Sequence, residues 1–173
     1  MGAALKPNGL DALRILIIDD NAQMRTILGT ILGGVGMRKL HYAPDGRAGL
    51  QSLREFVPDI VYVDYEMPLM NGLDFISAVR AFESNQRFTP IIMLTGHSDL
   101  PRLNAARDRG VNEFLAKPVT AKTIISRLST VIYKPRPFIK SPDFFGPERR
   151  RRRGGDYVGE LRRSTDLGAV HEL

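Results

Sequence analysis

Short apolar segments alternate with helical apolar periods along the first 133 residues. The segments RILIID (14–19), DIVYVD (59–64) and PIIMLTG (90–96) are almost continuously apolar, which is typical of strands buried on both faces of a sheet. KLHYA (39–43) alternates only weakly, as an edge strand does, and EFLAKP (113–118) supplies a fifth strand. A segment with helical spacing follows each of the five, so the pattern predicts five strand-helix units.

The helical segments carry apolar residues every three or four positions. The segment 21–36 has one apolar face made of Met24, Ile27, Leu28, Ile31 and Val35. The others are 45–56 with Leu50 and Leu53 inward, 72–84 with Leu73, Ile76 and Val79, the less apolar 98–110, and 120–132 with Ile124, Ile125, Leu128, Val131 and Ile132. Strands that are apolar on both faces predict an α/β fold, a doubly wound parallel sheet with helices on each side.

Composition and charge divide the chain near Tyr133. The 173 residues are 43% hydrophobic with a net charge of +6, of which +4 falls in residues 134–173. We expect a lead-in at 1–12, one domain at 13–133, and a Pro/Phe/Arg-rich C-terminal extension at 134–173 that is too short for an independent domain. The absence of cysteine, of a secretory signal pattern and of a long apolar run predicts a cytoplasmic protein with no transmembrane segment.

Polar side chains stand where the predicted strands end. The ends read Asp19-Asp20, Asp64, Thr95-Gly96 and Lys117-Pro118. In a doubly wound sheet these ends share one edge, where ligands bind. Taken singly, Asp20 or Asn21 could cap the first helix, and Ser98 or Asp99 the fourth. Independent caps do not explain acids at two strand ends with a lysine at another, so the set predicts a site.

Three acids at one edge repel one another unless a counter-charge is present. Mg²⁺ prefers oxygen ligands and is commonly held by one or two carboxylates together with phosphate oxygens. Asp64, alone at the end of the central strand, is then a candidate carboxylate nucleophile that forms an aspartyl phosphate. Lys117 and Mg²⁺ would supply positive charge, and Thr95 would donate a hydrogen bond to a phosphoryl oxygen.

These residues resemble the receiver domain of bacterial two-component response regulators, of the CheY-like, stand-alone type with a basic C-terminal extension. The marks are the acid pair Asp19-Asp20, the acceptor Asp64 in DYEMPLMNG, Thr95 in MLTGH, Phe114 and Lys117-Pro118. Their order fits that family over residues 13–133. The resemblance implies the flavodoxin-like (βα)5 fold with strand order 2-1-3-4-5.

The resemblance also implies roles for single residues. Asp20, Asp64 and the backbone carbonyl of Glu66 would bind Mg²⁺ directly, with Asp19 acting largely through water. The donor would be a histidine kinase or phosphotransfer protein. Thr95 would move toward the phosphoryl group and Phe114 would turn inward. This population shift would remodel the surface of the fourth helix, fifth strand and fifth helix, through which the domain would signal to a protein partner or form a homodimer.

Glu66 and His97 occupy the two places that tune the phosphoryl lifetime in the family. We expect Glu66 to repel, and His97 to obstruct, a water molecule that attacks the phosphoryl group. Loss of the phosphoryl group would then be slower than with small neutral residues. Both residues also suit an ordinary loop role.

The extension predicts a docking segment. KPRPFIKSPDFFGPE (134–148) mixes prolines with Phe138, Phe144 and Phe145, which favours extended, polyproline-like backbone. The rings would pack on the same chain, on a second copy or on another protein. The arginine run from Arg149 to Arg153 suits phosphate groups of nucleic acid or anionic lipid, although a solvated basic tail or a protein contact explains it as well.

Other function classes remain at this stage. One is a phosphate sink that drains a kinase, and another is a regulator that binds nucleic acid through its tail. An aspartate-nucleophile phosphatase of the haloacid dehalogenase type would need a second aspartate two residues after the nucleophile. DYEMP has Glu66 there, and DDNAQ does not supply such an aspartate either. The residues therefore predict a signalling module that catalyses only its own phosphorylation and dephosphorylation, and no enzyme acting on other substrates.

Overall fold

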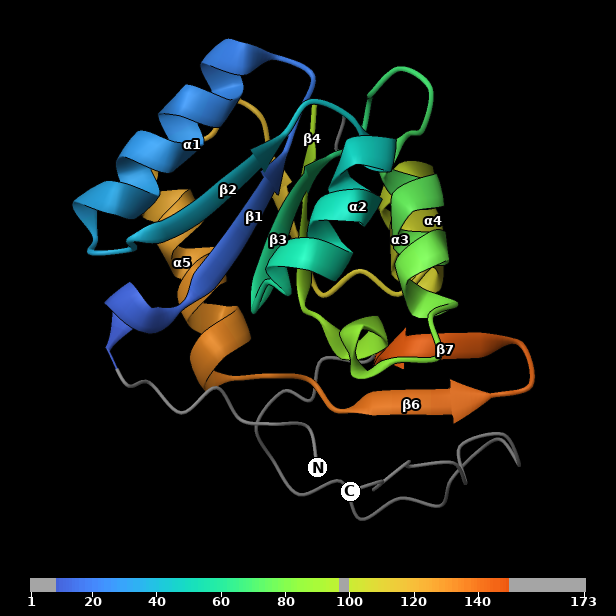
Figure 1. The fold of residues 1–173 in the computed structure, drawn as a ribbon. Coiled ribbons are helices and arrows are strands. Elements are labelled where there is room, and N and C mark those ends of the chain that lie inside the picture. The colour runs from blue at the N-terminus through green and yellow to red at the C-terminus, as the bar shows by residue number, and fades with distance from the viewer. Residues whose placement is uncertain (1–8, 97–99, 150–173) are drawn as a thin grey trace.

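A computed structural model describes residues 9–96 and 100–149, and the predicted five strand-helix units are present within them (Figure 1). The strands are β1 Arg14–Ile18, β2 Lys39–Ala43, β3 Ile60–Asp64, β4 Ile91–Thr95 and β5 Glu113–Ala116. The helices are α1 Ala22–Gly34, α2 Gly46–Phe56, α3 Gly72–Arg80, α4 Leu100–Asp108 and α5 Ala121–Tyr133, with short 3-10 helices η1 Leu10–Ala12 and η2 Asn85–Phe88. All sheet pairings are parallel in the order β2-β1-β3-β4-β5, which confirms the flavodoxin-like prediction.

Helices cover both faces of the sheet. On one face, alternate residues of the central strands, such as Ile17 and Tyr62, pack with Leu28 of α1 and Ile124 of α5. On the other face, their neighbours pack with α2, α3 and α4, where Phe75 is fully buried. Figure 1 shows the same two layers, with α1 and α5 on one side and α2, α3 and α4 on the other. The strands are apolar on both faces because each face forms a core.

The predicted inward face of α1 is partly wrong. Ile27 is 38% exposed, whereas Leu28 and Leu32 are both fully buried. Leu28 and Leu32 lie four residues apart on one helical face. Ile27 is displaced by one residue, about 100° around the helix, and therefore lies at the margin of the contact.

The extension continues beyond α5 as an antiparallel hairpin of β6 Phe138–Ser141 and β7 Phe144–Pro147. The prediction of polyproline-like backbone is therefore wrong for these residues. The prolines lie before β6, in the turn at Pro142 and at the last position of β7, where they leave the ladder of hydrogen bonds intact. The phenylalanine rings pack on the same chain, one of the three arrangements expected from the sequence: Phe138 and Phe145 each lie 5.3 Å from the ring of Phe88.

Among the described residues, no helix has the length and hydropathy needed to cross a bilayer. Helices α1, α2, α3 and α5 each begin at a side chain that accepts hydrogen bonds from backbone amides of the first turn, and Ser98 and Asp99, the caps expected for α4, lie outside the described residues. The N-cap residues of the four helices are Asn21, Asp45, Asn71 and Thr120.

Candidate functional site

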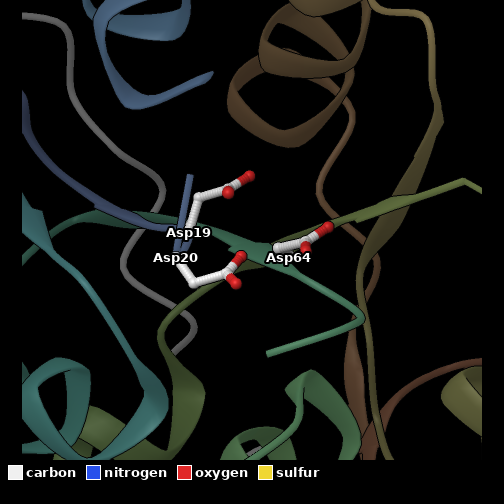
Figure 2. Close-up of side chains that lie close together, drawn as sticks. All are labelled: Asp19, Asp20 and Asp64. Atoms are coloured by element: carbon white, nitrogen blue, oxygen red, sulfur yellow. The ribbon is translucent and has the colours of Figure 1, made fainter. Parts of the chain in front are cut away.

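The carboxyl ends of β1 and β3 bring three acids together. Asp19 and Asp20 directly follow β1, and Asp64 is the last residue of β3. One carboxylate oxygen of each residue lies within 4.8 Å of those of the other two. Figure 2 shows the three side chains lying close together at the ends of the two neighbouring strands. Residues 45 positions apart in the chain meet because parallel strands end at the same edge.

The loop after β1 is fixed by its own hydrogen bonds. The backbone amide of Asn21 donates to Asp19 Oδ1 at 2.9 Å, and the Asn21 side chain caps α1. Asn21 is therefore the helix cap, and the carboxylates of Asp19 and Asp20 do not serve that purpose. Arg25 Nη1 donates to the carbonyl oxygens of Asp19 at 2.6 Å and Asp20 at 3.3 Å. Arg25 was not predicted as a site residue, because an arginine in the first turns of a helix carries no distinctive sequence signal.

Lys117 supplies a counter-charge. Its Nζ lies 2.8 Å from Asp64 Oδ1 and 3.4 Å from Asp19 Oδ2. Asp19 is fully buried and Asp64 is 5% exposed, whereas Asp20 is open to solvent. The peptide bond between Lys117 and Pro118 is cis. The ammonium group thus reaches the acids from the loop after β5, as the sequence predicted.

Burial and charge act in opposite directions on this ion pair. Burial raises the pKa of Asp64 above 3.8, and the hydrogen bond and positive charge of Lys117 only partly offset it. For Lys117, burial lowers the pKa, but the carboxylates of Asp64 and Asp19 outweigh burial and raise it above 10.5 overall. The lysine therefore stays charged, while the ionised form of Asp64 is disfavoured without a further cation.

Thr95 and Phe114 lie on the neighbouring strands β4 and β5. Thr95 ends β4, is 3% exposed, and accepts a backbone hydrogen bond at its carbonyl oxygen from Lys117 N at 2.8 Å. Phe114 lies opposite Met93 of β4 and is partly buried against the core formed with α2, α3 and α4. Thr95 thus stands at the end of β4, and Phe114 lies on the adjacent strand β5.

The side chain of Glu66 is ion-paired. Glu66 Oε1 accepts from Arg102 Nη1 of α4 at 2.8 Å, and the Arg102 guanidinium lies 5.3 Å from the ring centre of Tyr65. Arg102 was not predicted either, since it lies 36 residues away in a helix with little apolar pattern. His97 lies outside the described residues.

The residues present fit a magnesium ion. The metal-binding candidates offer oxygen atoms only, and two of the three carboxylates come from consecutive residues of one short loop. Such a donor set suits a hard divalent cation better than zinc, which favours nitrogen and sulfur. Asp20 is exposed, so hydrated ions can reach the site from solvent.

Comparison with known proteins points to one family. A sequence model described as the response regulator receiver domain matches residues 15–129. The chemotaxis protein CheY-3 of Vibrio cholerae is 33% identical over 119 residues, covering 69% of this chain and 91% of that protein. The DNA-binding response regulator MtrA of Mycobacterium tuberculosis is 32% identical over 115 residues, but the match covers 66% of this chain and only 48% of MtrA.

Solved structures agree with the sequence comparison. The chemotaxis response regulator CheY4 of Vibrio cholerae matches with a TM-score of 0.65 at 30% identity, covering 69% of this chain and 98% of that one. A response regulator receiver domain protein of Clostridium thermocellum matches with a TM-score of 0.64 at 28% identity, covering 70% and 95%.

Proposed function

The chain belongs to the family of response regulator receiver domains, and on that premise we propose that it accepts a phosphoryl group on Asp64 and passes this state to a protein partner by binding. Receiver domains interact with histidine kinases or phosphotransfer proteins, and we take one of these as the donor. The observation that carries the proposal is the meeting of three carboxylates with Lys117 at the end of the sheet. We also place the protein in the cytoplasm, where such donors present their phosphohistidine.

Receiver domains of this family bind Mg²⁺ through an acidic pocket, and this chain has a cluster of three aspartates at the corresponding edge of its sheet. We assign Asp20, Asp64 and the carbonyl oxygen of Glu66 as direct ligands, with Asp19 acting through water. When bound, the ion neutralises charge on the phosphoryl oxygens. Arg25 supports the ligands by holding the carbonyl groups of Asp19 and Asp20.

The chemistry is a displacement at phosphorus. A carboxylate oxygen of Asp64 forms the new bond to phosphorus, and the bond to the donor nitrogen breaks, with its electron pair staying on the donor imidazole. The Lys117 ammonium is already 2.8 Å from Asp64 and offers positive charge to an incoming phosphoryl oxygen. Burial of Asp64 keeps competing water away from the acceptor.

Signalling then follows from new negative charge at Asp64. We propose that the Thr95 hydroxyl moves to donate to the phosphoryl group and that Phe114 turns further inward. This changes the surface formed by α4, β5 and α5, which a partner or a second copy of the chain reads. Catalysis by this chain is limited to its own phosphorylation and dephosphorylation.

The lifetime of the phosphoryl group is proposed to depend on Glu66 and His97. The ion pair with Arg102 constrains the side chain of Glu66, two residues after Asp64, and we propose that the carboxylate still repels an attacking water molecule. We expect shorter phosphoryl half-lives in Glu66→Asn and His97→Ala than in the native chain. Unchanged or longer half-lives would contradict this role.

Mass spectrometry of the intact chain tests the main proposal. Incubation with acetyl phosphate and Mg²⁺ should add one phosphoryl group per chain, located at Asp64 by peptide analysis. Asp64→Asn should remain unlabelled, and Asp74→Asn, which alters an exposed acid at the start of α3, should label normally. Equal labelling of Asp64→Asn would refute the proposal, and steady hydrolysis of many phosphomonoester molecules per chain would favour an enzyme instead. A pull-down with and without beryllofluoride, a phosphoryl mimic, then separates a signalling module, which captures a partner in one state, from a phosphate sink, which captures none.

A further inference from the structure

The hairpin formed by β6 and β7 docks at the opposite end of the sheet from Asp64. In Figure 1 it lies beside η2 and the C-terminal end of α3, below the strands whose upper ends carry the site. The rings of Phe88, Phe138 and Phe145 pack with centroids 5.3–5.5 Å apart. The core of this contact is therefore aromatic.

Two arginines extend the aromatic contact into the receiver domain. Arg80, at the end of α3, is 5% exposed, and its guanidinium lies 5.0 Å from the centre of the Phe138 ring. Its donors reach the carbonyl oxygens of Arg87, Thr89 and Gly110 and the side chain of Asn112. The Arg87 guanidinium lies 3.7 Å from the centre of the Phe145 ring. A buried cation satisfied by backbone and covered by a ring marks a specific docking surface.

The hairpin also contacts the turn between α4 and β5. A Cβ atom added at Gly146 would lie 2.7 Å from the Cα atom of Gly110, so the two backbones touch. Arg149 pairs with Asp108, the last residue of α4, at 2.7 Å. Arg136, just before β6, lies 3.9 Å from Glu113 at the start of β5. Residues 136–149 therefore contact both α4 and β5, the two elements on either side of this turn.

Helix α4 links this docking surface to the site. Among residues 101–108, whose side chains the structure describes, only Ala106 is buried, so apolar packing anchors the helix weakly. Near its first turn, Arg102 pairs with Glu66, two residues after Asp64. At its other end, Asp108 pairs with Arg149. Helix α4 therefore carries one ion pair near the site and one at the docked segment.

We propose that the docked hairpin is an intramolecular brake that favours the position of α4 belonging to the unphosphorylated site. This inference rests on the proposed function and adds a regulatory element that the extension supplies. The extension contacts α4 through the ion pair between Arg149 and Asp108, and it contacts the turn after α4 through the backbones of Gly146 and Gly110. Phosphorylation that displaces α4 weakens these contacts. Undocking of the hairpin breaks them beforehand, so the displacement of α4 then costs less free energy. The coupling is reciprocal. The docked hairpin lowers the affinity of the site for a phosphoryl group by some factor, and a phosphoryl group at the site lowers the equilibrium constant for hairpin docking by the same factor.

The test measures the affinity of the full-length protein for beryllofluoride in excess Mg²⁺ by calorimetry. Gly146→Val forces the hairpin away from the Gly110 backbone, and Phe145→Ala removes the ring that packs on Arg87 and Phe88. Both changes lie outside the site. Lys140→Ala, an exposed residue of β6, is the matched control. Hydrogen exchange of residues 138–147 reports docking in each variant, so a variant that unfolds globally is recognised and the other is used.

We expect both undocked variants to bind beryllofluoride at least fivefold more tightly than the native chain and Lys140→Ala. In the native chain, saturating beryllofluoride should speed amide exchange in residues 138–147. Equal or weaker binding by variants whose hairpin is undocked would overturn the brake while leaving the proposed function intact. Absence of beryllofluoride binding in the native chain would instead overturn the proposed function, and the brake with it.

Discussion

At the scale of single residues, the site balances a buried carboxylate against one ammonium group. Asp64 is 5% exposed and has Lys117 at 2.8 Å, yet burial still raises its pKa. The ammonium group of Lys117 therefore does not by itself offset the cost of burying the ionised Asp64 carboxylate. Asp19, fully buried and 3.4 Å from the same ammonium, adds to the deficit of positive charge.

The raised pKa of Asp64 predicts a pH-dependent cost in stability. Below 3.8 the carboxyl group is protonated in both the folded and the unfolded chain. Between 3.8 and the raised value the folded chain binds the proton more tightly, so stability falls as pH rises through this window. Asp64→Asn should therefore raise the Tm of the metal-free protein near pH 7 by about 2–4 °C, with no gain at pH 3. Thermal unfolding followed by circular dichroism at both pH values checks this, and a lower Tm of the variant at pH 7 would contradict it.

Lys117→Ala should separate metal binding from phosphoryl transfer. Removing the ammonium group leaves the acids more negative, so the Mg²⁺ affinity should rise, by roughly three- to tenfold. The charge offered to the phosphoryl oxygens is lost, so labelling by acetyl phosphate should slow by about 10²–10³-fold at saturating Mg²⁺. Calorimetry and labelling kinetics measure the two effects. A variant that loses both together would show that Lys117 mainly holds the structure of the site.

At the scale of elements, the turn from β3 to α3 is shaped by close backbone packing. Gly72 begins α3, and its amide donates to the carbonyl oxygen of Tyr65 at 3.0 Å. A Cβ atom at Gly72 would clash with the carbonyl oxygen of Asp64 and approach Tyr65 Cα to 3.1 Å. The glycine thus lets the helix start directly behind the acceptor strand, and it positions the loop that contains Glu66.

Gly72→Ala should therefore disturb the site through the backbone. We expect a loss of about 1–3 kcal/mol in the free energy of unfolding and at least tenfold weaker Mg²⁺ binding. Gly33→Ala in α1 is the control, because nothing lies within 4 Å of the added Cβ. It should leave metal binding unchanged and raise stability by up to about 1 kcal/mol. Denaturant unfolding and calorimetry compare the pair, and equal Mg²⁺ affinities would refute the role given to Gly72.

At the scale of the whole molecule, the two ends of the sheet carry different contacts. The carboxyl ends of the strands hold the acids and Lys117, whereas the hairpin packs on η2 before β4 and on the turn before β5. Phe144 of the hairpin is 8% exposed, and the Arg149 guanidinium lies 4.5 Å from the centre of its ring. The described part of the extension, up to residue 149, thus packs against the receiver domain.

A chain that ends at Tyr133 should fold but with lower stability. It loses the rings that cover Arg80 and Phe88, which should cost about 1–3 kcal/mol in the free energy of unfolding. Urea unfolding of the shortened and full-length chains measures the difference, with Lys140→Ala as a full-length control. Equal stabilities would show that the hairpin adds no net stabilisation to the domain.

Much of the fold followed from local pattern. The strands are apolar on both faces because helices cover both faces, and α5 ends at Tyr133 where the prolines begin. The site followed as well, because Asp20, Asp64, Thr95 and Lys117 stand at strand ends. The pattern was less informative where a residue lies at the margin of a contact, as Ile27 does.

The sequence by itself determined the order of elements, the buried strands and the edge at which the acids meet, since these depend on residue type and on spacing along the chain. Tertiary structure alone decided the contacts between remote polar residues: Arg25 on the carbonyl groups after β1, Arg102 on Glu66, and Arg80 beneath Phe138. It also decided that the proline-rich segment pairs as a hairpin. The physical reason is that a long cationic side chain or an aromatic ring suits many surroundings equally, and only packing of the whole chain selects one partner.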